Sequence, residues 1–103
     1  MILPDDPILT ELLPSFCDDW ERQLDVDRWP DLVVTRSRQD LRLFGHTVMG
    51  SFAQFGLPEG AHLGKALMAC ARDDDWERAA GHVDALRCLL SAVRRALAGL
   101  PSA

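Results

Sequence analysis

Apolar residues recur every three or four positions along four stretches of the chain, and this spacing predicts four amphipathic helices. The first stretch begins at Pro7, a favourable first helical residue after two aspartates, and extends to about Leu24. Pro14 interrupts it, and a proline inside a helix removes one hydrogen bond and clashes with the preceding turn. We therefore expect either a kink near Leu13 or a short helix followed by a second one that begins at Ser15.

A break in helical structure is expected after this first stretch. Trp29 is followed by Pro30, and the residue before a proline is pushed out of the α region. Residues 31–35 are then expected to form a connector, either a short extended segment or a turn, that packs against the helices.

The second long helix is expected to begin after Ser37. Ser37 and Asp40 resemble a capping box, with aspartate in place of the usual glutamate or glutamine. The apolar period continues from there to about Phe55, and Gly56 supplies a residue suited to the C-terminal cap.

The third helix is expected from Pro58 to about Arg72, since a proline is favourable in the first turn. Within it, Gly60 and Gly64 lie four residues apart, on one side of the helix. Glycines at this spacing permit the close approach of a neighbouring helix.

The last helix is expected to open at the three aspartates 73–75 and to end at Gly99. The short connections between the last three helices imply antiparallel neighbours, hence an all-α, up-and-down four-helix bundle. The shared periodicity predicts a core of Leu12, Phe16, Trp20, Leu41, Phe44, Val48, Phe55, Leu63, Leu67, Val83, Leu86, Leu90 and Val93.

Length and charge narrow the function classes. A chain of 103 residues that is 48% hydrophobic is expected to form one domain over residues 1–103. Its net charge of -5 argues against nucleic-acid and anionic-membrane partners, both of which reward clustered lysine and arginine. No segment has the apolar length of a membrane span or the pattern of an export signal, so we expect a cytoplasmic monomer. The initiating Met1 favours a free-standing protein over a domain of a larger kinase.

Cysteine usage gives no metal or disulfide pattern. Cys17, Cys70 and Cys88 are odd in number, lack CxxC spacing and lie in apolar stretches. We expect reduced core thiols rather than disulfides, nucleophiles or zinc ligands.

One histidine stands out on the second long helix. At 100° per residue, Phe44, Val48 and Phe55 lie roughly opposite His46, which should therefore point away from the core. Around His46, the same face carries Gln39, Arg42, Met49, Gly50 and Ala53. A glycine inside a helix costs about 1 kcal/mol relative to alanine, so its presence one turn after an exposed histidine favours a surface on which a partner docks. An ordinary solvated surface histidine is the alternative interpretation.

The residues around His46, HTVMGSFAQFG, resemble the signature of histidine-containing phosphotransfer (HPt) domains. In that family a phospho-accepting histidine lies on a bundle helix and is followed four residues later by a glycine, with another glycine near the helix end. His46, Gly50 and Gly56 match these positions. The resemblance covers most of the chain: an apolar helix with Phe16 precedes the motif, a helix with Leu63 and Leu67 follows it, and a short acidic turn leads to a long last helix.

The sequence departs from the family pattern at two positions. The family usually has a lysine three residues after the histidine, where this chain has Met49. A polar side chain of the third helix, commonly glutamine, corresponds here to Met68. Arg42 and Lys65, and also Arg38, are the remaining cations that could stabilise a phosphoryl group, although each could equally be a solvated surface charge.

The resemblance implies a phosphoryl carrier without kinase activity of its own. His46 would accept a phosphoryl group from a receiver-domain aspartate and pass it to another, because a neutral imidazole is a competent nucleophile near pH 7. The partners implied are response-regulator receiver domains or a hybrid histidine kinase, and the partner would supply Mg²⁺ and its acidic pocket. The chain itself is expected to hold no cofactor or metal.

Two other functions remain open. An HPt-like module that has lost phosphotransfer could dock or sequester a response regulator, and Met49 and Met68 favour this alternative. A small enzyme with His46 as general base is a weaker candidate, because no Asp, Ser or Cys is spaced on its helix face to orient the imidazole. His62 and His82 are weaker site candidates still, and His82 is expected to be a partly buried structural histidine.

Overall fold

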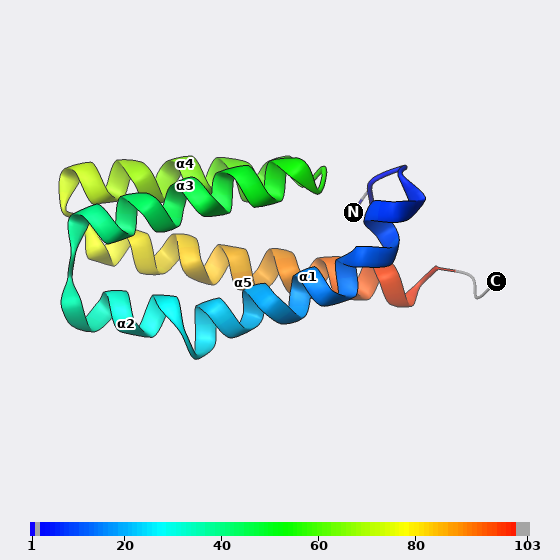
Figure 1. Ribbon diagram of the computed structural model, residues 1–103, viewed down its shortest axis with the longest axis horizontal. Helices are drawn as coiled ribbons and strands as arrows, with labels where there is room; N and C mark the ends of the chain where they lie inside the picture. Colours follow the sequence, from blue (N-terminus) through cyan, green and yellow to red (C-terminus); the bar gives the residue numbers. More distant parts are fainter. Residues whose placement is uncertain (2, 101–103) are drawn as a thin grey trace.

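The computed structural model describes residue 1 and residues 3–100 of the chain, and its regular structure is helical throughout this part. Four long helices and one short helix are present, without a strand among the described residues (Figure 1). In chain order they are α1 (Pro7–Asp25), α2 (Arg28–Thr35), α3 (Arg38–Gln54), α4 (Pro58–Asp73) and α5 (Trp76–Ala98).

Helix α1 is continuous through its internal proline. Asp6 caps it by accepting a hydrogen bond from the amide of Ile8 at 2.9 Å, and Pro7 is the first helical residue. Pro14 lies inside the helix, and Figure 1 shows the first turns of α1 set at an angle to the later ones. Of the two alternatives expected at Pro14, the structure therefore has the kink rather than two separate helices.

The expected connector at residues 31–35 is wrong, because these residues belong to α2. The break lies earlier, at Val26 and Asp27, and Pro30 occupies the third position of the new helix. A proline is tolerated there, since the amides of the first turn have no intrahelical acceptor in any case. Arg36, in the left-handed conformation with φ 55°, ends α2 before the chain turns into α3.

The caps of the remaining helices confirm the expected boundaries. Ser37 Oγ accepts a hydrogen bond from the amide of Asp40 at 3.2 Å, at the start of α3. Gly56 follows the end of α3 with φ +69°, a conformation that favours glycine. Asp75 caps α5 by accepting from the amide of Arg78 at 3.1 Å.

Successive long helices run in opposite directions, with α3 against α4, α4 against α5 and α5 against α1 (Figure 1). Aromatic side chains fill the space between α1 and α3: Phe16 meets Phe52 with ring centroids 4.9 Å apart, and Trp20 meets Phe44 at 6.1 Å. The buried core also includes most of the predicted residues, namely Leu41, Val48, Leu67, Val83, Leu86, Leu90 and Val93.

Three predicted core residues differ from expectation. Leu12 is 49% exposed, whereas Leu13 is fully buried. Adjacent residues of a helix point about 100° apart, so only one of the two faces the core. Phe55 and Leu63 are only partly buried, at the margin of the core.

Helices α3 and α4 are held at close range by glycines. A Cβ atom on Gly45 would lie 2.8 Å from the carbonyl oxygen of Gly64 and 2.9 Å from the amide nitrogen of Met68. A Cβ atom on Gly64 would lie 2.7 Å from the carbonyl oxygen of Gly45, and one on Gly60 would overlap the ring of Phe52. The close approach expected from Gly60 and Gly64 is therefore confirmed, and we call this contact the glycine seam.

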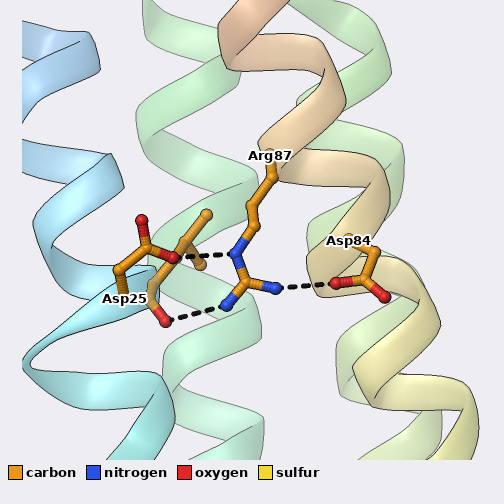
Figure 2. A network of polar contacts seen from close by, with 4 residues as sticks. Asp25, Asp84 and Arg87 are labelled. Atoms are coloured by element: carbon orange, nitrogen blue, oxygen red, sulfur yellow. Dashed lines mark hydrogen bonds and ion pairs between the residues drawn. The ribbon is translucent and has the colours of Figure 1, made fainter.

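Helices α1 and α5 are instead joined by charged side chains, a contact that we call the ionic seam. Arg87 of α5 donates to Asp25 Oδ1 at 2.8 Å and to the carbonyl oxygen of Leu24 at 3.2 Å, and it also pairs with Asp84 of its own helix (Figure 2). Further along α5, Arg94 donates to both carboxylate oxygens of Glu21, at 2.7 and 2.9 Å, and to Asp18. The hydrogen bonds to Glu21 and Asp18 raise the pKa of Arg94 above its usual range.

Candidate functional site

His46 is exposed on α3, in the middle of the helix, as the sequence predicts. Its side chain makes no hydrogen bond or ion pair with the rest of the described chain. A Cβ atom on Gly50 would meet nothing within 4 Å, and Ala53, one turn further on, is also exposed. The imidazole therefore stands on a face where small residues leave room for an approaching molecule.

Gly45, the residue before His46, ties this part of α3 to α4 and was missed by the sequence analysis. Its α-carbon faces Gly64 and Met68 across the glycine seam, so it is the backbone at this position that contacts α4. The adjacent His46 is rotated about 100° around the helix from that contact. The seam thus fixes the direction in which the imidazole is presented.

A groove of about 600 Å³ runs between α3 and α4 beside His46. It brings together four of the predicted site residues, Arg42 and Met49 from α3 with Lys65 and Met68 from α4. Gly50, Ala53 and His46 do not line it, although His46 lies between two lining residues along α3, one turn after Arg42 and one turn before Met49. The remaining lining residues are Arg38, Gln39, Ala69, Ala71 and Arg72.

Arg38 fixes one end of this groove. Its guanidinium donates to the carbonyl oxygens of Ala71 and Arg72, the former at 3.0 Å. These carbonyls lie in the last turn of α4, where backbone acceptors have no partner within the helix. The Arg38 side chain therefore caps α4 from the first residue of α3 and joins the two helices at this end.

The other groove cations are less constrained. Arg72 pairs with the neighbouring Asp73 at 3.3 Å, and both side chains are largely exposed. Arg42 and Lys65 have neither a hydrogen bond nor an ion pair with any other side chain in the described part of the molecule. Their charges are consequently available to a bound anion.

The other histidines lie outside this groove. His62 is exposed near the start of α4 and lines a shallow depression of about 350 Å³ that Ala53 and Lys65 also line. His82 is half-buried in α5, as expected, and its Nε2 atom is buried without a hydrogen-bond partner in the described chain. His82 therefore lacks the exposure of His46, whereas His62 is exposed beside Lys65 but lies near the start of α4 rather than in the middle of α3.

The cysteines agree only in part with expectation. Cys17 and Cys70 are free and buried, and burial raises the pKa of both thiols, which keeps them protonated. Cys88 is free but exposed, so its expected place in the core is wrong. It lines an open depression between α4 and α5, whereas the core face of α5 is taken by Leu86, Leu89 and Leu90. Among the described residues, no three His, Cys, Asp or Glu side chains cluster as a metal site would require.

Comparison with known proteins gives no match: no family model, no curated protein and no solved structure is significantly similar to this chain. A search of the described helices for a length and hydropathy sufficient to cross a bilayer also finds none.

Proposed function

We propose that this chain is a histidine phosphotransfer protein, which accepts a phosphoryl group on His46 from the aspartate of a receiver domain and passes it to another receiver. The single observation that supports this most is the presentation of His46, exposed at mid-helix, with open space over Gly50 and cations on the adjoining groove wall. An HPt-like bundle requires this arrangement, because the histidine must reach into a partner's active site.

In the proposed transfer, the main task of this chain is to present the His46 imidazole to the receiver domain. A ring nitrogen of His46 attacks the phosphorus atom, a P–N bond forms, and the acyl P–O bond breaks to release the receiver's carboxylate. The Mg²⁺ ion and acidic pocket that stabilise the in-line transition state belong to the receiver. Small residues at positions 50 and 53 leave space for that pocket to close over the imidazole.

The phosphoryl group would add about two negative charges at His46. Arg42, one helical turn before His46, is the nearest unpaired cation on the same helix, and Lys65 lies across the groove. Charge-assisted donors of this kind replace the lysine that the HPt pattern places where this chain has Met49. They support the carrier function in spite of that departure.

The test is transfer from a panel of phosphorylated receiver domains to the purified chain, followed by detection of acid-labile phosphate. The expected result is labelling of the parent chain and none of His46→Gln, with both proteins equally helical by circular dichroism. If no competent donor labels the parent chain, the proposal that it carries phosphoryl groups is wrong.

A second candidate is an HPt-like module that binds a response regulator without phosphotransfer. The observation in its favour is the apolar lining of the groove by Met49 and Met68 where polar neighbours would assist a phosphoryl group. Binding of a receiver domain by an unlabelled parent chain, and equally by His46→Gln, would identify this function instead.

A further inference from the structure

The groove between α3 and α4 concentrates positive charge on an acidic protein. Four of the eleven Lys and Arg residues of the chain line it, although the net charge is -5. Its lining contains no aspartate or glutamate. The charged side chains of the lining are therefore all positive on a chain of net negative charge, which favours an anionic ligand.

The shape of the groove favours a small molecule with an apolar body. Its volume of about 600 Å³ lies within the range of about 300 to 1,000 Å³ that is usual for small-molecule sites. Met49 and Met68 enter from opposite helices, together with Ala69 and Ala71. Methionine thioethers adapt to irregular apolar groups and make favourable contacts with aromatic rings.

The cations are arranged on both sides of this apolar lining. Arg42 belongs to α3, whereas Lys65 and Arg72 belong to α4, and the glycine seam holds the two helices at a fixed separation. Arg38 is already oriented by its hydrogen bonds to the last turn of α4. A ligand with several phosphates could contact more than one of these cations without a rearrangement of the backbone.

We propose that this groove is a binding site for an organic polyphosphate of nucleotide size, with its phosphates on Arg42 and Lys65 and its apolar or aromatic body on Met49 and Met68. Binding at this place is independent of the proposed phosphotransfer. Since Arg42 and Met49 lie one turn to either side of His46, an occupied groove covers one flank of the imidazole. If the chain is a phosphotransfer protein as proposed above, the bound ligand competes with receiver docking. Only this consequence depends on the proposed function.

The test is calorimetric titration of the full chain with ATP, ADP, AMP and adenosine in the absence of Mg²⁺. Affinity should rise with each added phosphate, and the affinity for ATP should fall several-fold between about 50 and 300 mM salt as the charges are screened. ATP should also bind more tightly than inorganic tripolyphosphate, because only ATP has a body to contact the two methionines.

Substitution of the groove cations tests whether ATP binds at this place. Arg42→Gln combined with Lys65→Gln should weaken ATP binding roughly tenfold or more, since two charge-assisted contacts are lost. The matched control is Arg78→Gln combined with Arg95→Gln, which removes the same charge from exposed positions of α5 and should change the affinity less than about twofold. Circular dichroism verifies that both variants are folded.

The proposal is overturned if adenosine or tripolyphosphate binds as tightly as ATP, if the control variant loses as much affinity as the groove variant, or if ATP does not bind at millimolar concentration. A hexaglutamate peptide that binds where ATP does not would identify a surface for acidic proteins instead. His46→Gln should bind ATP like the parent, so the outcome of this experiment is separate from that of the phosphotransfer test.

Discussion

The two seams of the bundle achieve helix contact by opposite means. In the glycine seam between α3 and α4, backbone lies against backbone at Gly45 and Gly64 with no room for a methyl group. In the ionic seam between α1 and α5, Arg87 and Arg94 span the gap with long, partly exposed side chains (Figure 2). The first contact tolerates no change in spacing, whereas the second can adjust by side-chain rotation.

The candidate site lies on the helices joined by the glycine seam and not on those joined by the ionic seam. His46 and the groove cations all lie on the two helices that the glycine seam joins, and none lies on α1 or α5. A close-packed contact is insensitive to salt, while exposed ion pairs are screened by it. We infer that the site is built on the more rigid pair of helices, and the following predictions test that contrast.

The largest effect is expected from a methyl group in the glycine seam. Gly64→Ala should lower the free energy of unfolding by about 2 to 3 kcal/mol, because its Cβ would overlap backbone atoms of α3 and force the helices apart. Urea denaturation followed by circular dichroism measures the change. The loss should be nearly the same at low and high salt, and a strongly salt-dependent loss would contradict the contrast.

A smaller effect is expected from the ionic seam. Arg94→Met keeps the aliphatic stem but removes the contacts to Glu21 and Asp18, and should cost about 1 kcal/mol of stability at low salt. The same denaturation experiment in about 1 M salt should show most of this difference gone. A cost that persists at high salt would mean that the stem packing, not the charge, holds α1 to α5.

Substitution of alanine for a glycine outside the glycine seam should raise the stability of the chain rather than lower it. Gly50→Ala should stabilise the chain by about 0.5 to 1 kcal/mol, because the added methyl group meets nothing and alanine has the higher helix propensity. Gly81→Ala in α5 is the matched control, since it is equally open and lies far along the chain from His46. Both substitutions should raise the urea midpoint by similar amounts.

Gly50 and Gly81 are equally open, but only Gly50 lies one helical turn from His46. Gly50→Gln should leave the helical content unchanged yet hinder receiver docking and transfer, whereas Gly81→Gln should affect neither. If the Gly50 variant exchanged phosphate at the parent rate, the docking face would have to lie elsewhere on the bundle.

The smallest effect concerns the charge at position 49. Met49→Lys should shift the equilibrium towards phosphorylated His46 by a factor of about two to five, since one exposed charge-assisted contact contributes roughly 0.5 to 1 kcal/mol. Arg42→Ala should shift it in the opposite direction. The ratio of phosphorylated carrier to phosphorylated receiver at equilibrium measures both changes, and an unchanged ratio in Arg42→Ala would exclude Arg42 as the compensating cation.

Features set by neighbouring residues were predictable from the sequence. The caps at Asp6, Ser37 and Asp75 depend on a side chain and an amide two or three residues away, and all three lie at the helix starts that the sequence predicts. The exposure of His46 follows from helical period alone, because the apolar face of α3 is well defined.

Features set by contacts between helices were not predictable in the same way. The role of Gly45 depends on Gly64 and Met68, which lie about one helix away in the chain. The groove depends on cations of α3 and α4 that become neighbours only when the seam closes, so Arg72 could not be assigned to it. Helix α2 was missed because the sequence does not show that a helix begins at Arg28. A proline inside a helix breaks it, whereas Pro30 lies in the first turn of α2, where a proline is tolerated.

The most direct test of the account is phosphate localisation in a chain with a single histidine. The variant with His62→Gln and His82→Gln retains only His46 and should accept acid-labile phosphate from a phosphorylated receiver to the same extent as the parent chain. Mass spectrometry of the intact protein under neutral conditions measures the added phosphate. A folded single-histidine chain that takes up none, while the parent is labelled, would contradict His46 as the acceptor.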